Sequence, residues 1–300
     1  MNQVWTTLEI VRWTSGYLEV KGFDEPRLNA ELLLAGVLGL KRLDLYLQFD
    51  RPLGPEELAE FKSRLRRRLR HEPIQYIEGV AHFRGLELKV DQRVLIPRPE
   101  TEVLVGEVLA WAGGRDAPDV LDLGTGSGAI ALSLRQEGNF GRVIATDLSE
   151  EALHVARGNR DRLMPDLLVE FRCGNGLAPV AGERFDVIVS NAPYVGRRDG
   201  SALPPEVREW EPSTALFAGE DGLDVIRHLI DLAPDHLRPG GLLALEIGAE
   251  QGDEVATLVR QSASFGDPSI RRDLAGRERI LLAEAIADVA TLERASQSRE

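Results

Sequence analysis

The chain has 300 residues, enough for two domains with separate cores, and its one cysteine, Cys173, excludes an intrachain disulfide and a cysteine-rich metal cluster. The net charge is −13. Residues 1–95 carry 15 basic and 14 acidic side chains, whereas residues 96–300 carry 21 basic and 35 acidic ones. This acidic second part disfavours nucleic-acid binding, which depends largely on Lys and Arg. No apolar run approaches the roughly 18 residues of a membrane span and no signal-peptide pattern is present, so we expect a cytoplasmic protein that binds no membrane.

Residues 1 to 72 have the apolar spacing of helices. One helix begins at Pro26 and ends at Gly39, and a second begins at Pro55 and ends in the arginines from Arg66 to Arg70. Those arginines either match the helix dipole at a solvated helix end or meet an acidic partner or RNA. We expect a small helical domain that helps to recognise a partner.

Residues 73 to 95 change to a β-like pattern and predict a hairpin that links two domains, with strands in Tyr76–Val80 and Phe83–Val90. After the hairpin, a helix begins among prolines and charged residues. Arg98 and Glu100 in this segment either mark the helix start or line a pocket.

A strand, a glycine-rich turn and an apolar helix follow in residues 120 to 134. Glycines let a ligand approach the backbone, and about twenty residues later Asp147 ends a second strand, where it can hold ribose hydroxyls. This combination favours an adenosine-containing cofactor, and both NAD and S-adenosylmethionine remain open. The candidate cofactor-binding residues in the turn are Asp122, Gly124, Thr125, Gly126, Ser127 and Gly128.

Two further strands end in polar residues. Leu168–Phe171 is followed by Asn175 and Gly176, which are either a cofactor contact or a turn. The apolar run after Phe185 leads into Asn191-Ala192-Pro193-Tyr194, which is either a loop exit or an active-site edge. In the second case the Asn191 oxygen accepts a hydrogen bond, Pro193 fixes the backbone and Tyr194 supplies a flat wall.

The remaining elements alternate between helix and strand, as in Leu223–Leu232 (helix), Gly240–Gly248 (strand), Gln251–Gln261 (helix) and Arg279–Ala283 (strand). This order predicts an α/β fold with a largely parallel sheet. The expected domains are a helical substrate-recognition domain (1–72), a β-hairpin linker (73–95), a catalytic α/β domain (96–286) and a polar C-terminal tail (287–300).

The chain resembles the HemK/PrmC-type protein-glutamine methyltransferases, which modify peptide chain release factors. The resemblance covers nearly the whole chain, and the motifs that carry it are Pro73–Ile77, Leu95–Glu102, Asp122–Gly128, Ser190–Tyr194, Glu211–Pro212, Asp221–Leu223 and Leu245–Gly248. It implies a Rossmann-like class I methyltransferase sheet and methylation of the side-chain nitrogen of a glutamine, expected in a GGQ motif. The implied cofactor is S-adenosyl-L-methionine, the product is S-adenosyl-L-homocysteine, and no metal is needed.

The family's turn is Asn-Pro-Pro-Tyr, and this chain has Ala192 at the second position. The resemblance implies that the substrate NH2 is held by the Asn191 side chain, which also borders the cofactor, and by the main-chain carbonyl of residue 192. Alanine keeps that carbonyl. Asn191, Pro193 and Tyr194 are therefore the candidate catalytic residues, and these three with Ala192 are the candidate substrate-binding residues.

Three other functions fit parts of the sequence. Methylases of adenine or cytosine amino groups share the Asn-x-Pro-Tyr turn, an NAD-linked oxidoreductase would share the glycine pattern, and a non-catalytic module would tolerate Ala192. The acidic second part argues against the first, the lack of a clear acid-base pair against the second, and the intact Asn191, Tyr194 and Asp147 against the third. We expect release factors as partners, no direct nucleic-acid binding and a monomer.

Overall fold

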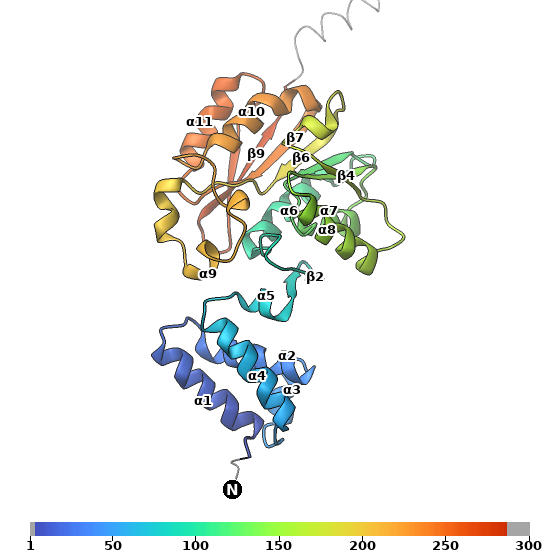
Figure 1. The fold of residues 1–300 in the computed structure, drawn as a ribbon. Helices are drawn as coiled ribbons and strands as arrows, with labels where there is room; N and C mark the ends of the chain where they lie inside the picture. The colour runs from blue at the N-terminus through green and yellow to red at the C-terminus, as the bar shows by residue number, and fades with distance from the viewer. Residues whose placement is uncertain (1–3, 287–300) are drawn as a thin grey trace, which may run out of the picture. The chain divides into compact units, whose positions relative to one another are not determined.

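A computed structural model describes residues 4–286 (Figure 1). The expected C-terminal tail, residues 287–300, lies outside the described residues. Within them the chain forms two compact units: unit 1 extends to Val80 and also includes Pro204–Trp210, and unit 2 comprises Ala81–Leu203 and the residues from Glu211 onward. The domain boundaries expected at residues 72 and 95 remain predictions. None of the helices in residues 4–286 is both long enough and apolar enough to cross a membrane.

Unit 1 is helical, as the apolar spacing predicts. Thr6 caps the first helix in a capping box with Glu9, and Gly39 ends the second helix in a left-handed conformation. Buried leucine and phenylalanine side chains, among them Leu33 and Phe61, form its core. The helices are α1 (Thr7–Val20), α2 (Pro26–Leu38), α3 (Asp44–Leu47), α4 (Pro55–Arg68), α5 (Ile74–Glu78) and α9 (Pro205–Arg208).

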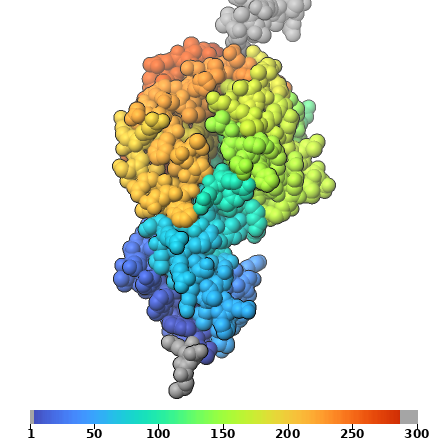
Figure 2. Space-filling model, viewed as in Figure 1, coloured from blue at the N-terminus to red at the C-terminus, as the bar shows by residue number. Residues whose placement is uncertain are grey.

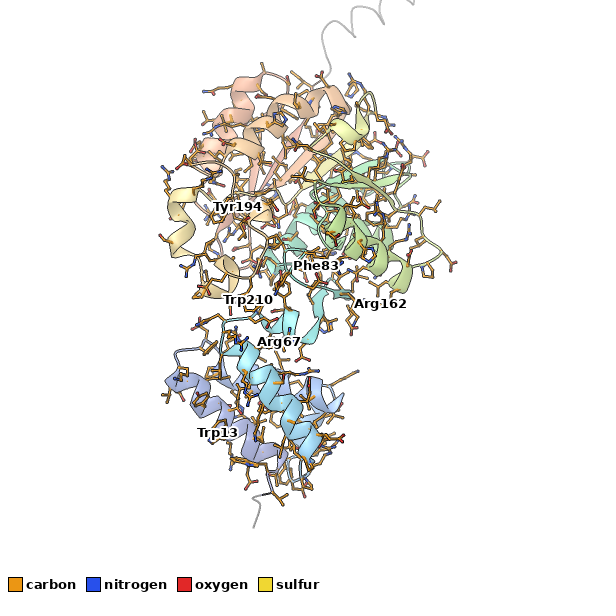
Figure 3. All side chains as sticks on the ribbon, viewed as in Figure 1. Trp13, Arg67, Phe83, Arg162, Tyr194 and Trp210 are labelled. Carbon is orange, nitrogen blue, oxygen red and sulfur yellow. The ribbon has the colours of Figure 1, made fainter. Side chains whose placement is uncertain are left out.

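The segment Pro204–Trp210 is held in unit 1 by polar contacts. Arg68, which is only 6% exposed, pairs with Glu206 at 2.7 Å, and the Trp210 indole N–H donates to the Arg70 carbonyl at 3.1 Å (Figure 3). Arg68 also donates to Asn29 at 2.6 Å. A buried arginine with these partners has a structural role within unit 1.

The strand predicted at Tyr76–Val80 is wrong for most of its length, because the structure has helix α5 there. Pro73 precedes this helix with φ −57°, and Gly79 ends it with φ 71° while its N–H donates to the Gln75 carbonyl. A short apolar run between turn residues fits one helical turn as well as a strand. The hairpin itself is present as β1 (Val80–Phe83) and β2 (Leu86–Lys89).

Unit 2 contains a seven-stranded, mostly parallel sheet in the order β5-β4-β3-β6-β7-β9-β8, so the predicted α/β fold is confirmed. Among the strands in residues 4–286, β9 runs antiparallel to both β7 and β8, while β3 to β7 pair in parallel. The strands are β3 (Val120–Leu123), β4 (Val143–Asp147), β5 (Glu170–Cys173), β6 (Phe185–Ser190), β7 (Leu237–Glu246), β8 (Ser269–Arg272) and β9 (Glu278–Glu284).

Helices pack on this sheet because its central strands are apolar on both faces. Ile226 of α10 and Val255 of α11 lie in one buried cluster with Ile188 of β6 and Leu243 of β7. Helices α6, α7 and α8 lie together, away from α10 and α11 (Figure 1). The helices of unit 2 are α6 (Pro99–Ala112), α7 (Ala129–Glu137), α8 (Glu150–Leu163), α10 (Asp224–His236) and α11 (Gly252–Ser262), with short 3-10 turns η1 (Ala178–Val180), η2 (Arg197–Ala202) and η3 (Ser213–Ala215).

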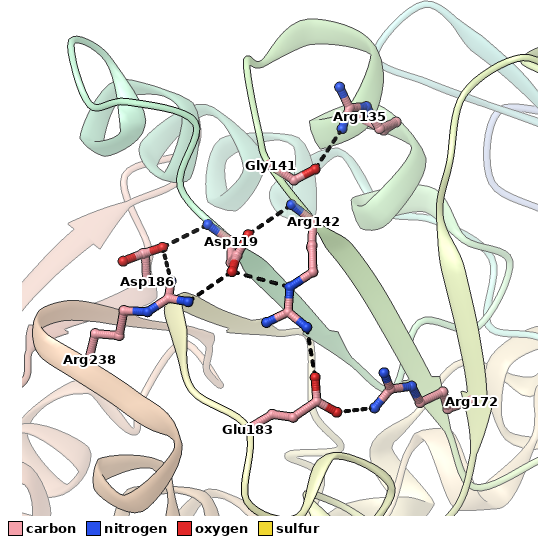
Figure 4. Close-up of polar contacts among 8 residues, drawn as sticks. All are labelled: Asp119, Arg135, Gly141, Arg142, Arg172, Glu183, Asp186 and Arg238. Carbon is pink, nitrogen blue, oxygen red and sulfur yellow. Dashed lines mark hydrogen bonds and ion pairs between the residues drawn. The ribbon is translucent and has the colours of Figure 1, made fainter.

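An ion-pair network joins the amino-terminal ends of the parallel strands (Figure 4). Asp119, just before β3, accepts from Arg142 at 3.2 Å and from Arg238 at 2.9 Å. Arg238 also pairs with Asp186, and Arg142 with Glu183. These side chains fasten strand starts that are distant in sequence, and the carboxyl ends of the same strands carry the candidate site.

Candidate active site

The glycine turn after β3 presents accessible backbone at the carboxyl edge of the sheet. Gly124 and Gly126 have φ of 71° and 55°, a conformation that residues with a Cβ rarely adopt. A Cβ built on either residue would meet no atom within 4 Å, so open space borders the turn at both positions. A ligand could therefore approach the main chain closely at these two glycines.

The other predicted residues of this turn lie beneath it. Thr125 and Ser127 are buried, and so is Gly128, the N-cap residue of α7. Asp122 is fully buried, and its Oδ2 accepts from the Thr125 hydroxyl at 2.6 Å and from the Ala131 N–H at 3.1 Å. Burial raises the pKa of Asp122 to about 7, against the lowering effect of these two hydrogen bonds. In this structure Asp122 and Thr125 fix the shape of the turn.

Asp147 ends β4 next to the glycine turn. Its Oδ2 accepts from the Gly126 N–H at 2.9 Å, and its Oδ1 accepts from the Ser149 N–H at 2.9 Å. A carboxylate has about four lone-pair positions, so both oxygens can accept further hydrogen bonds. Asp147 thus joins the ends of β3 and β4 and remains partly accessible to a ligand.

The exit of β5 lies beside that of β4. The Gly174 N–H donates to the Asp147 carbonyl at 2.9 Å, which holds the two exits together. Asn175 follows with an exposed side chain, and Gly176 is partly exposed. The predicted cofactor residues of β3, β4 and β5 therefore lie along neighbouring strand ends.

The exit of β6 completes this edge. The Ser190 hydroxyl donates to the Leu123 carbonyl at 2.7 Å and fastens β6 to β3. Asn191, Pro193 and Tyr194 are partly buried, and Ala192 is only 3% exposed. Tyr194, labelled in Figure 3, packs against the buried core cluster of unit 2, and the space-filling view shows a hollow between the orange and the green segments of this unit (Figure 2).

Two residues that the sequence did not single out as site residues contact the Asn191–Tyr194 turn. Thr101, on the first turn of α6, accepts from Asn191 Nδ2 at 3.0 Å and donates to Glu246 Oε2 at 2.6 Å. Glu246, the last residue of β7, also accepts from the Tyr194 hydroxyl at 3.2 Å. Burial raises the pKa of Glu246, while the hydrogen bonds from Thr101 and Tyr194 lower it. The signal available in the sequence was an acid, Glu246, directly after the apolar run Leu242–Leu245.

Arg98 and Glu100, considered as pocket residues, have ion-pair partners in unit 2. Arg98 donates to Glu211 at 2.5 Å, and Glu211 is only 6% exposed. Glu100 pairs with Arg277 at 2.8 Å. The Arg98 pair joins the segment before α6 to the Glu-Pro motif that precedes η3.

Comparisons with known proteins agree with this architecture. The PrmC N-terminal domain family matches residues 9–79, and a methyltransferase domain family matches residues 115–246. Among solved structures, a methyltransferase from Pyrococcus furiosus covers 68% of this chain and 91% of its own, with a TM-score of 0.51 and 23% identity. The catalytic domain of hMettl16 covers 68% and 76%, with a TM-score of 0.54 and 15% identity. At these identities the structures show a shared fold.

The sequence relatives are more similar. The release factor glutamine methyltransferase of Geobacter sulfurreducens is 42% identical over 279 residues, which is 93% of this chain and 96% of that protein. That of Chlorobaculum tepidum is 42% identical over 280 residues, or 90% and 94% of the two chains. That of Cereibacter sphaeroides is 43% identical over 266 residues, or 89% and 94%. The expected resemblance is confirmed, and the chain belongs to the release factor glutamine methyltransferase family.

Proposed function

We propose that the protein transfers a methyl group from S-adenosylmethionine to the side-chain amide nitrogen of a glutamine in peptide chain release factors, within a GGQ motif. The observation that carries the proposal is the position of Asn191. Asn191 directly follows the last residue of β6, and β6 pairs with β3, whose glycine turn is joined to Asp147 by a hydrogen bond. An acceptor for a substrate amide and a surface for an adenosine cofactor thus share one sheet edge.

The residues of that edge fit S-adenosylmethionine. Open space at Gly124 and Gly126 would admit it to the main chain, and Asp147 would accept hydrogen bonds from the ribose hydroxyls. Asn175 and Gly176 would border the same cofactor. When bound, the cofactor supplies an electrophilic methyl group on a sulfonium sulfur, and after the transfer it is S-adenosylhomocysteine.

The catalytic task of the protein residues is to orient a weak nucleophile, because the lone pair of an amide nitrogen is delocalised. Asn191 Oδ1 and the Ala192 carbonyl accept the two N–H groups of the glutamine side chain. Pro193 restricts the backbone of Ala192, and the Tyr194 ring packs on the planar amide. Orientation of this kind can supply about 7 to 11 kcal/mol in the best cases.

In this proposal, the helical residues 1 to 72 form the domain that recognises the release factor. The predominantly acidic catalytic part supports a protein substrate and argues against direct nucleic-acid binding. We propose that the protein acts as a monomer. We place the reaction in the cytoplasm, since release factors act in translation and the chain has one cysteine.

The decisive experiment is incubation with labelled S-adenosylmethionine and purified release factors, followed by mass spectrometry of the labelled peptide. The expected result is one methyl group on the glutamine of the GGQ motif. A release factor in which this glutamine is replaced by alanine is the matched control and should remain unlabelled. Equal labelling of both forms would contradict the proposal.

Replacement of Asp147 by alanine should weaken the binding of S-adenosylmethionine about 10- to 100-fold, because hydrogen bonds to a charged group contribute about 1.5 to 3 kcal/mol. Isothermal titration calorimetry measures the effect without a turnover assay. Asp161→Ala, which removes an exposed carboxylate elsewhere in unit 2, is the control for the change in net charge. Unchanged affinity in Asp147→Ala would remove Asp147 from the cofactor site.

Replacement of Ala192 by proline should raise kcat about two- to fivefold. Within residues 4–286 the Ala192 N–H donates no hydrogen bond, so proline removes no donor interaction. It removes backbone freedom worth about 0.4 to 1 kcal/mol. Steady-state assays on one release factor should rank Ala192→Gly below wild type and Ala192→Pro above it. A large loss in the proline variant, together with a lower melting temperature, would show that the buried site does not accept the ring.

A further inference from the structure

Asn191 can perform its role only if the oxygen of its side-chain amide, and not the nitrogen, faces the acceptor site. The two ends of an amide have nearly the same shape, so packing alone does not distinguish them. The orientation of the Asn191 amide must therefore be defined by its hydrogen-bond partners. The hydrogen bonds behind Asn191 meet this requirement.

A series of hydrogen bonds connects three segments of unit 2: the turn after β6, helix α6 and strand β7. Asn191 Nδ2 lies 3.0 Å from Thr101 Oγ1, and Thr101 Oγ1 lies 2.6 Å from Glu246 Oε2. Thr101 is 3% exposed and Glu246 is 1% exposed. Since these groups are shielded from water, the pattern of donors and acceptors is set by the protein.

The direction of this series follows from the chemistry of its members. In its ionised form, the Glu246 carboxylate accepts one hydrogen bond from Tyr194 and one from Thr101 and has no proton to donate. The Thr101 hydroxyl has one proton, which it donates in the hydrogen bond to Glu246. In its contact with Asn191, the Thr101 oxygen can therefore only accept a hydrogen bond. Only the NH2 end of the Asn191 amide can donate to it.

We propose that Thr101 and Glu246 are positioning residues that fix the orientation of the Asn191 amide, so that its NH2 faces Thr101 and its oxygen is available to the substrate NH2. This inference rests on the proposed role of Asn191 in glutamine methylation. Glu246 serves a second member of the same turn, because its other oxygen accepts from the Tyr194 hydroxyl. One buried carboxylate thereby orients both Asn191 and Tyr194.

The test replaces Thr101 by valine, which has nearly the same shape and cannot accept a hydrogen bond, and by serine, which can. Thr101→Val should lower kcat about 10- to 100-fold, as expected when a group in the site is misoriented. Its affinity for S-adenosylmethionine should stay within about twofold of wild type, since it acts on the acceptor side. Thr101→Ser should recover most of the rate. Glu246→Gln, whose amide can donate to Thr101 and allow the reversed orientation, should also lose about tenfold or more in kcat.

A matched control comes from unit 1. Thr14 is buried, and its hydroxyl has no hydrogen-bond partner within the described residues. Thr14→Val makes the same chemical change away from the catalytic unit and should leave kcat unchanged. A loss of rate in Thr101→Val that serine does not reverse would indicate a packing defect and overturn the proposal.

A readout that does not depend on turnover separates this inference from the proposed function. With selective 15N-asparagine labelling, the side-chain NH2 signal of Asn191 is identified by its absence in Asn191→Ala. One of its protons should exchange slowly with solvent in wild type and Thr101→Ser, and fast in Thr101→Val. If wild type methylates no release factor but this pattern holds, the function is wrong and the orientation stands. If wild type is active and Thr101→Val matches it in rate and exchange, the orientation proposal is wrong.

Discussion

Replacing Asn191 with alanine should lower the rate of methyl transfer about 100- to 1,000-fold, the typical loss when one oriented polar group is removed from an active site. The expected cause is that the glutamine amide loses its side-chain acceptor, while the Ala192 carbonyl remains. Single-turnover assays with saturating S-adenosylmethionine and a release factor measure this rate directly.

The fold and the cofactor site should tolerate this change. Asn191 has one hydrogen bond behind it, to Thr101, and the glycine turn and Asp147 are held by other contacts. The melting temperature and the cofactor affinity of the variant should therefore stay close to those of wild type. Retention of more than about a tenth of the wild-type rate is incompatible with the proposed role.

Replacing Gly222 with alanine should destabilise the turn around Tyr194. Gly222 has φ 83°, and a Cβ there would lie 2.2 Å from the Tyr194 carbonyl oxygen and 2.9 Å from the Gly196 nitrogen. The left-handed conformation and the forced backbone shift together correspond to about 2 to 5 kcal/mol of unfolding free energy. Urea denaturation measures the loss, and kcat should fall with it because the backbone that must move belongs to Tyr194.

Gly182→Ala is the matched control for this change. Gly182 has φ 79°, and its Cβ would meet no atom within 4 Å. It carries the penalty of the left-handed conformation alone, about 1 to 2 kcal/mol, and should keep normal kcat. Equal loss of stability in both variants would mean that the contact with Tyr194 can relax at no cost.

The sequence predicted those parts of the site that depend on neighbouring residues. The apolar strand Val120–Leu123, its glycines and the acid after β4 form local patterns, and the structure places them at one sheet edge. The Asn191–Tyr194 turn is likewise a continuous motif at a strand end. Their catalytic and binding roles remain proposals.

The unpredicted parts depend on contacts between distant residues. Thr101 and Glu246 are 145 positions apart, and each has a plausible local explanation, as a residue of a helix start or of a strand end. Only the packing of α6 against β7 shows that they share a hydrogen bond. The helix at Ile74–Glu78 was missed for a different reason, since its apolar run is too short to have a distinct period.

The contacts of Pro204–Trp210 make the helical unit discontinuous along the chain. Arg70 and Trp210 are 140 positions apart, and Arg68 pairs with Glu206. During synthesis, unit 1 can therefore be completed only after β3, β4, β5 and β6 of the sheet have been made. A gene fragment that ends at Val80 would encode helices α1 to α5 without Glu206, the acidic partner of the buried Arg68. We therefore expect that fragment to fold less stably than the same helices in the whole protein.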